Sequence, residues 1–366
     1  MLKRLLSKIA LSALVASTTA ASADVTTIVT NKIDNYKAHR AFTGAVVAVV
    51  DHGYYYYYWF GWKNATDEMT VTTPVAIASN TKTFVGTSLA LADAYEGLPK
   101  ETELHTLVPI AGFSPPYHAT LEDLVSYWSG LPRDVQAAHQ TRADLYNTLS
   151  ECAFWGDPCF TPETQNLYSN YGFEVLGNVL ADYAGFGKWS DMNAQDITGP
   201  LGMTKTCARG DGCHPNFSTS HAHAYDFWGN DVALPDYSDV SAPKGGLWST
   251  AEDMAIWLRY QLGYIPSSTQ ELTRLNAVLP ELRKKLPSGS GYSWQFSTLT
   301  FRDGSTAKVR WKLGRYMGLN SYIGLADAKG TAVFVFVNRD GSDPVLESPD
   351  IVLRDELGEP LLQMFP

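Results

Sequence analysis

The chain has 366 residues, of which 45% are hydrophobic and 18% charged, which is ordinary for a globular protein and ample for a large core. Its formal net charge is −10. This acidic balance argues against nucleic acid or anionic lipid as a partner, because phosphate binding depends on clustered Lys and Arg. The length suits one large catalytic unit or two domains.

Residues 1–23 have the pattern of an export signal. The segment starts with basic residues, is mostly apolar over 5–15, and ends in the small-residue sequence Ala-Ser-Ala at 21–23. A membrane anchor is the alternative, but the apolar run is too short to span a bilayer. Cleavage would leave 25 basic and 38 acidic side chains, a net charge of −13. We therefore expect a periplasmic or secreted protein that consists of residues 24–366.

Four cysteines form two close pairs in the sequence, Cys152 with Cys159 and Cys207 with Cys213, each beside turn residues. Four cysteines allow three pairings, and pairing between sequence neighbours is the favoured one. A zinc site is the competing hypothesis, since His214, His221 and His223 follow. The spacing is not that of structural zinc sites, so two small disulfides and no metal are predicted.

The first predicted elements are two strands, 45–51 and 54–60, joined as a hairpin by His52-Gly53. The second strand contains five consecutive tyrosines, Tyr54 to Tyr58. Such a run can form a sugar-stacking platform, but tyrosine also suits half-buried positions on a pleated sheet. Sheet packing is therefore the preferred interpretation.

Helices are expected in the middle of the chain and strands return near its end. The predicted helices cover 79–96, about 171–184, and segments that start after the caps Thr120 and Thr250. The predicted late strands cover 292–296, 308–312, 321–326 and 331–338, and a last helix opens at 348 and stops near Gly358. This order predicts one α/β (α+β) unit, with a sheet from about 24–75 and 290–366 and a helical lobe inserted over about 79–289.

Ser79-x-x-Lys82 is the candidate nucleophile. At the start of a predicted helix, residues three apart share a face, so the Ser79 hydroxyl and the Lys82 amine can meet. A serine needs a neighbouring base, and a lysine serves when burial or another cation lowers its pKa. The same spacing recurs at Ser241/Lys244, which encloses a proline, and at Ser305/Lys308, which follows a turn into a strand. Those two copies are disfavoured.

Tyr168-Ser169-Asn170 immediately precedes a well-formed amphipathic helix. At a helix entrance, the phenol of Tyr168 can project into a cleft and act as a base when cations stabilise its phenolate. Free tyrosine has a pKa of about 10. The alternative is a simple capping segment, in which Ser169 or Asn170 binds the first helix amides.

Lys312-Leu313-Gly314 is expected to end a strand and to continue into Arg315. A glycine at a strand edge lets a substrate backbone approach closely, and an edge strand can hold a peptide by added hydrogen bonds. The amides of Ser79 and Arg315 are candidates for an oxyanion hole. An exposed strand end without function is the alternative.

Taken together, Ser79-x-x-Lys82, Tyr168-x-Asn170 and Lys312-x-Gly314 resemble the three active-site motifs of class C β-lactamases and their penicillin-binding DD-peptidase and esterase relatives. The class A version of the second motif begins with serine. The resemblance extends in family order over nearly the whole mature chain, and its nearest branch is the AmpH-type carboxypeptidase/endopeptidase. Further matching stretches are 121–132, 200–203, 245–253 and 318–322.

The resemblance implies a mainly antiparallel sheet flanked by helices and a role for each motif residue. Ser79 is the nucleophile, Lys82 accepts or relays its proton, and Tyr168 acts as general base and then as acid. Asn170 orients substrate and lysine, Gly314 lies at the substrate-binding strand, and Lys312 keeps the site cationic. No metal or organic cofactor is implied.

Leu313 departs from the family pattern, which commonly has a threonine or serine whose hydroxyl helps to bind a substrate carboxylate. A lost hydrogen bond to a charged group costs about 1.5–3 kcal/mol, and Arg315 is the residue that could compensate. Three functions stay open: an exported DD-peptidase on peptidoglycan stem peptides, an esterase or β-lactamase on small molecules, and a slow-turnover penicillin-sensing or peptidoglycan-binding module.

Overall fold

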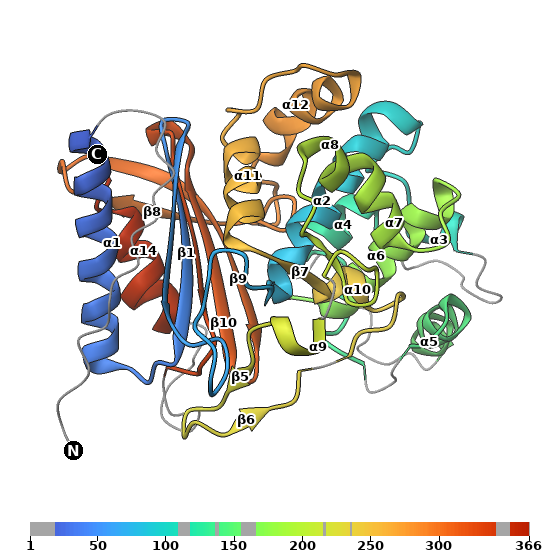
Figure 1. The fold of residues 1–366 in the computed structure, drawn as a ribbon. Coiled ribbons are helices and arrows are strands. Elements are labelled where there is room, and N and C mark those ends of the chain that lie inside the picture. The colour runs from blue at the N-terminus through green and yellow to red at the C-terminus, as the bar shows by residue number, and fades with distance from the viewer. Residues whose placement is uncertain are drawn as a thin grey trace.

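One six-stranded antiparallel sheet with helices on both faces organises the chain in the computed structural model (Figure 1). The structure describes residues 19–108, 118–135, 139–154, 166–214, 217–234, 236–341 and 352–365. The strand order is β2-β1-β11-β10-β9-β8, and the strands are β1 (Gly44–Asp51), β2 (Tyr54–Gly61), β8 (Gln295–Thr300), β9 (Thr306–Tyr316), β10 (Leu319–Ala326) and β11 (Thr331–Val337). The predicted sheet built from both ends of the chain is confirmed.

The central strands are apolar on both faces because both faces of the sheet are covered. In β1, Val46, Ala48 and Val50 belong to the core shared with the helical lobe, whereas Ala45, Val47 and Val49 belong to a second core. Successive side chains of a strand point to opposite faces, so this continuous run of buried residues serves two layers. The second core lies under helices α1 (Thr19–His39) and α14 (Glu359–Leu362), on the side of the sheet away from the lobe (Figure 1).

Helix α1 packs on the sheet through residues spaced at three and four positions: Val25, Ile28, Val29, Ile33 and Tyr36 are buried. These anchors all follow residue 23, the end of the predicted signal. The export signal itself stays a prediction. Among the helices in the described ranges, none is both long enough and apolar enough to cross a membrane.

The inserted lobe consists mainly of helices, with α11 lying directly against the sheet and α2 next to it (Figure 1). Its helices are α2 (Thr81–Leu91), α3 (Leu104–Leu107), α4 (Leu121–Val125), α5 (Arg142–Phe154), α6 (Asn170–Tyr183), α7 (Trp189–Asn193), α8 (Gly199–Leu201), α9 (Phe217–Ser220), α10 (Ala242–Gly245), α11 (Ala251–Gln261) and α12 (Gln270–Leu282). Its short strands are β3 (Val75–Ala76), β4 (Cys207–Ala208), β5 (Ala224–Tyr225), β6 (Asp231–Val232) and β7 (Leu247–Ser249).

The predicted helix caps are present. The side chain of Thr120 accepts from the amide of Asp123, whose carboxylate accepts from the amide of Thr120, so both groups of a capping box are satisfied. Thr250 caps α11 by accepting from the Asp253 amide, while the Asp253 carboxylate accepts from the Lys205 amide and the Thr206 hydroxyl. The tyrosine run forms β2, where Tyr58 is buried and Tyr54 and Tyr55 remain exposed.

Three predicted boundaries near the end of the chain need correction. Strand β8 starts at Gln295 rather than 292, since Ser293 has a φ of 68° that interrupts an extended backbone. Strand β9 does not end at Lys312 but continues to Tyr316, paired with β10. The last helix does not stop at Gly358. That glycine lets the helix approach the ring of Tyr322, which a Cβ there would meet at 2.4 Å.

One predicted disulfide is confirmed, between Cys207 and Cys213. The other favoured pair includes Cys159, which lies outside the described residues, as does the predicted start of the last helix at 348. His214 lies close to the confirmed disulfide. Because its two sulfurs are bonded to each other, they offer no thiolates to a metal ion.

Candidate active site

The residues of the three sequence motifs converge on one cavity of about 260 Å³ between the start of α2, the start of α6 and strand β9. The described residues that line the cavity are Ser79, Arg133, Tyr168, Asn170, Gln295, Lys312, Leu313 and Arg315. Of the other predicted site residues, Lys82 is fully buried behind Ser79. Gly314 lies in β9 between two lining residues.

The turn that carries Ser79 has an unusual backbone. Ala78, immediately before the serine, has a φ of 48°, a left-handed conformation that is uncommon for residues other than glycine. The surrounding structure holds this strained turn in place. The side-chain amide of Asn80 donates to the Ser321 hydroxyl at 2.8 Å, and that hydroxyl donates to the Ile77 carbonyl at 3.1 Å. Strain of this kind is concentrated at functional sites.

Gly314 has a packing role that the sequence did not indicate, and its predicted role in substrate binding stays a prediction. A Cβ at this position would lie 2.3 Å from the Ile77 carbonyl oxygen and 2.4 Å from the Ser321 hydroxyl. The glycine therefore allows β9 to pass against the turn of the nucleophile. The close approach is made by the protein's own chain, and this contact positions Ser79 relative to Lys312.

Two groups reach the Ser79 hydroxyl. The phenol oxygen of Tyr168 lies 2.7 Å from Ser79 Oγ, and Lys82 Nζ lies 3.1 Å from it. Ser169 caps α6 by accepting from the Gly172 amide at 2.8 Å. The capping segment and the catalytic motif, which the sequence presented as alternatives, are thus combined: the cap directs the chain so that Tyr168 faces the cavity.

Lys82 is surrounded in a way that suits an uncharged amine. Its Nζ donates to Asn170 Oδ1 at 2.8 Å and to the Lys244 carbonyl. Burial lowers the pKa of Lys82 well below its usual range, and the Lys312 ammonium lowers it further. A neutral amine has two N–H groups and one lone pair. With both N–H groups donated, the lone pair remains for the Ser79 proton.

Lys312 is the second buried lysine of the site and has an exposed fraction of 2%. Its Nζ donates to the phenol of Tyr127 and lies 4.6 Å from the ring centre of Tyr168. Burial lowers the pKa of Lys312 to about 7, and the guanidinium of Arg133 contributes to the shift. Lys312 therefore changes its charge near neutral pH, next to the phenol that contacts the nucleophile.

Sequence reasoning missed Tyr127, Arg133, Asp134 and Gln295. Tyr127 has a φ of 64° and stacks on Tyr168 at 5.0 Å, so it supports both the phenol and Lys312. Arg133 also lies over the Tyr168 ring, 5.2 Å from its centre, and Asp134 accepts from the side-chain amide of Asn170 at 2.9 Å. The available signal was the family-like stretch 121–132, which ends one residue before Arg133.

The charge of the cavity lining is entirely positive among the described residues. Arg133, Lys312 and Arg315 supply cations, and no lining residue is acidic. Strand β9 also offers a free edge here, because its register with β8 ends at Trp311. The predicted strand edge is therefore present, although β9 as a whole lies between β8 and β10.

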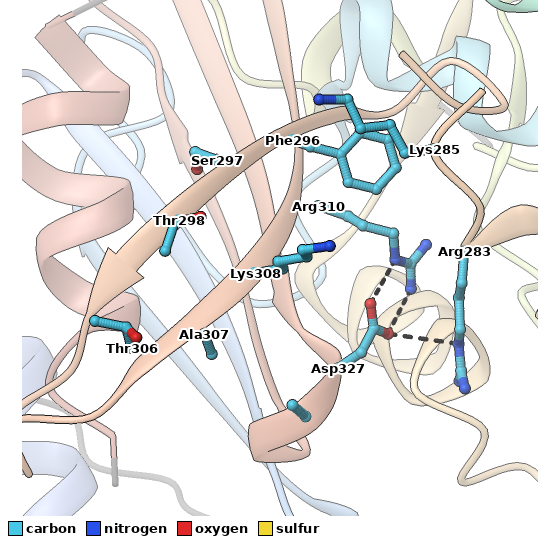
Figure 2. A pocket seen from close by; sticks show the side chains of 11 residues that line it. Arg283, Lys285, Phe296, Ser297, Thr298, Thr306, Ala307, Lys308, Arg310 and Asp327 are labelled. Carbon is cyan, nitrogen blue, oxygen red and sulfur yellow. Dashed lines mark hydrogen bonds and ion pairs between the residues drawn. The ribbon is translucent and has the colours of Figure 1, made fainter. Parts of the chain in front are cut away.

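A second cavity, of about 650 Å³, is larger than the one around Ser79 (Figure 2). It lies at the far part of β8 and β9 and contains none of the predicted site residues. Its one acidic lining residue, Asp327, accepts from Arg310 at 2.7 Å and lies 3.4 Å from Arg283 Nε. The smaller cavity remains the candidate site, because the hydroxyl, the phenol and the amines of the sequence motifs converge there and not in the larger one.

Comparison with protein families and solved structures shows the family of the chain and agrees with its fold. A family model described as Beta-lactamase matches residues 29–356. A solved class C beta-lactamase is similar with a TM-score of 0.79 at 18% identity, over 94% of this chain and 98% of that one. A beta-lactamase/D-alanine carboxypeptidase from Pseudomonas syringae is similar with a TM-score of 0.73 at 18% identity, over 86% and 94%. Likenesses at this identity show the fold.

Two curated proteins match part of the chain. Protein flp of Staphylococcus aureus is 24% identical over 243 residues, which is 63% of this chain and 47% of that protein. Beta-lactamase-like protein 2 of Dictyostelium discoideum is 26% identical over 242 residues, or 60% and 42%. The chain thus spans about half the length of the curated relatives that it matches.

Proposed function

The chain belongs to the beta-lactamase family, and from this premise we propose that it is an exported serine hydrolase that works through an acyl-enzyme on Ser79. The observation that carries the proposal is the position of one hydroxyl within 3.1 Å of both a buried amine and a phenol. The basic and apolar start of the sequence and the Cys207–Cys213 disulfide support export.

The chemistry follows from these contacts. Lys82, as the neutral amine, takes the Ser79 proton directly or through Tyr168, while Ser79 Oγ forms a bond to the substrate carbonyl carbon. The amides of Ser79 and Arg315 are the proposed donors to the oxyanion. The C–N or C–O bond then breaks, and Tyr168 delivers the proton to the leaving group. Water attacks the acyl-enzyme by the same route and regenerates Ser79.

The substrate class that fits the cavity carries a carboxylate next to the scissile bond. Three basic residues line the cavity, and Asp134, which lies 3.6 Å from Arg133 Nε, is not part of the lining. A bound carboxylate would find a positive surface there. We therefore favour the D-alanyl-D-alanine end of peptidoglycan stem peptides, cleaved by carboxypeptidase or endopeptidase action. The side chain of Leu313 has no hydrogen-bond donor, which leaves Arg133, Arg315 and protonated Lys312 as the side chains that would bind the carboxylate.

A class C-like β-lactamase is the second candidate, because β-lactams present a carboxylate in the same relation to the acyl carbon and the fold is that of class C enzymes. A carboxylesterase is the third, and the apolar Leu313 favours it. The three differ in the leaving group and in the rate at which water releases the acyl group. A sensor that is acylated but not released would share the site as well.

The experiment that distinguishes these functions follows the formation and hydrolysis of the acyl bond to Ser79. Mature protein is labelled with a fluorescent penicillin, the adduct is located by mass spectrometry, and its release is timed. Turnover of a D-alanyl-D-alanine peptide, a chromogenic cephalosporin and a short-chain aryl ester is measured in parallel. Peptide cleavage without cephalosporin turnover supports the peptidase, ester turnover alone supports an esterase, and a stable adduct without any turnover supports the sensor.

Replacing Arg133 or Arg315 by alanine is expected to weaken binding of carboxylate substrates. Each arginine is in a position to donate to the carboxylate, and such a bond is worth about 1.5–3 kcal/mol, so KM should rise roughly tenfold to a hundredfold. The peptide with a C-terminal amide should lose little, because it lacks the charge. Arg302→Ala, at an exposed arginine between β8 and β9, is the control. Equal losses for acid and amide would contradict this role.

The pH dependence should show the unusual pKa of Lys312. Below about pH 7 Lys312 is protonated and attracts the carboxylate, whereas above this pH it loses its charge, so kcat/KM for carboxylate substrates should fall. Arginine stays protonated at all accessible pH values, and Lys312→Arg should move the alkaline limb to higher pH. Lys308→Arg, four residues earlier on β9, should leave the limb in place. An unchanged limb in Lys312→Arg would assign the titration to another group.

A further inference from the structure

The second Ser-x-x-Lys sequence, Ser241 to Lys244, meets a buried carboxylate directly behind the catalytic cavity. Glu174 has an exposed fraction of 1%. Its oxygens accept from the Ser241 hydroxyl at 2.7 Å and from Lys244 Nζ at 2.9 Å, and they lie 3.0 Å from Nδ1 of the buried His139. Nothing in the acyl-transfer chemistry described above uses these groups.

The carboxylate belongs to a face of α6 that fits α10. Residues three and four apart on a helix share a face, and Gly177 and Asn178 follow Glu174 at these spacings. A Cβ at Gly177 would meet the ring of Pro243 at 2.4 Å, so the glycine permits direct packing. The Asn178 amide donates to the Val240 carbonyl at 2.8 Å. Helix α6 therefore holds the segment 240–244 by packing and by three side-chain contacts.

The last residue of this segment, Lys244, contacts Lys82, the lysine beside Ser79. The carbonyl oxygen of Lys244 accepts from Lys82 Nζ, and it is one of the two acceptors that leave the amine lone pair directed at Ser79. The side chain of Lys244 is bound by Glu174 while its carbonyl is bound by Lys82. The position of the carbonyl thus depends on where Glu174 holds the residue that carries it.

The same residue also brings charge close to Lys82. The charged groups that face Lys82 are Lys312 from β9, Arg133 and Asp134 from the segment before the α5 region, and Lys244 from α10. The Lys244 ammonium acts to lower the pKa of Lys82, and the Glu174 carboxylate is the counter-charge beside that ammonium.

We propose that Glu174, Lys244 and Ser241 form a positioning network that holds the Lys244 carbonyl on Lys82 and balances the charge near it. The proposal rests on the proposed function, in which Lys82 takes the Ser79 proton. Among the described residues, the Glu174 carboxylate makes no hydrogen bond or ion pair with Ser79 or with the cavity lining, so it acts through Lys244. The second Ser-x-x-Lys sequence is then a support for the first one.

Two substitutions with opposite electrostatic effects test the network. Lys244→Met removes a cation and should raise the pKa of Lys82, so the acid limb of kcat/KM should move to higher pH. Glu174→Gln removes the counter-charge and should move this limb to lower pH. Both should reduce the acylation rate at the plateau by roughly tenfold to a hundredfold, because the amine is less well placed, and both should leave KM nearly unchanged.

Conservative and remote variants separate positioning from general damage. Lys244→Arg keeps a cation for Glu174 and should restore most of the acylation rate. Glu281, on α12, forms an ion pair with Lys100 at 2.7 Å. Glu281→Gln breaks this pair and should change neither the acylation rate nor its pH profile. Ser241→Ala removes only the hydrogen bond from the Ser241 hydroxyl to Glu174. It replaces Glu174→Gln as the test of the network if that variant fails to fold. In the double variant Glu174→Gln/Lys244→Met the loss should be smaller than the product of the single losses.

The assay is acylation by an activated aryl ester, which needs only the nucleophile and its base, with the D-alanyl-D-alanine peptide measured in parallel. Limbs that move in opposite directions, with rescue by Lys244→Arg, support the network. Limbs that stay fixed or move together overturn it. If the wild-type protein turns over the ester but not the peptide, the proposed peptide substrate is wrong, but the network can still be tested with the ester. If wild type forms no acyl adduct, both proposals are overturned.

Discussion

Ser79→Ala is expected to abolish formation of the acyl-enzyme. Alanine retains the strained turn after Ala78 but removes the oxygen that Tyr168 and Lys82 contact at 2.7 and 3.1 Å. Loss of a serine nucleophile typically reduces kcat by about 10⁴-fold or more, and the remainder comes from binding and the oxyanion donors. The measurement is intact-mass detection of the penicilloyl or acyl adduct together with turnover of peptide, cephalosporin and ester.

The chain supplies a matched control for this substitution. Ser305 begins another Ser-x-x-Lys sequence, but its hydroxyl donates to Asp303 at 2.6 Å on an exposed turn. Ser305→Ala should keep the full rate and the full adduct. An adduct of unchanged stoichiometry on Ser79→Ala would place the nucleophile elsewhere and would remove the basis of the proposed function.

Tyr168→Phe should produce the second largest loss, about 10²- to 10⁴-fold in kcat, the range typical of removing a general acid or base. Only the phenol oxygen is deleted. The ring can still stack on Tyr127 at 5.0 Å and remains beside Lys312 at 4.6 Å. We therefore expect little change in KM and in the thermal midpoint. Pre-steady-state acylation, followed with the aryl ester, measures the step concerned.

Tyr171→Phe, in the first turn of the helix that follows Tyr168, is the control. Its hydroxyl donates to the Leu145 carbonyl at 3.2 Å inside the protein, so the substitution should cost on the order of 1 kcal/mol of stability and leave kcat unchanged. A Tyr168→Phe enzyme with wild-type acylation would show that Lys82 alone moves the proton. The chemistry would then depend on one base instead of two.

Most helices and strands could be predicted from the sequence because caps and hydrophobic periodicity act between residues that are close in the chain. The capping residues Thr120 and Thr250 each satisfy an amide three residues ahead. Tyr168, Ser79 and Lys82 were likewise recognisable because each motif is contiguous. Boundaries failed where a distant residue decided them. Gly358 reads as a helix stop in the sequence, but it is helical and leaves room for the ring of Tyr322.

The sequence by itself predicted the two-ended sheet, the inserted helical lobe, the Cys207–Cys213 bridge and the candidate site residues Ser79, Lys82, Tyr168 and Lys312. Only the tertiary structure decided that Gly314 serves the nucleophile's own turn and that Lys244 supports Lys82 through its carbonyl. The physical reason is that periodicity and capping act over one helical turn. Burial and charge at Lys82 depend on β9, α10 and the segment around Arg133, which meet only after folding.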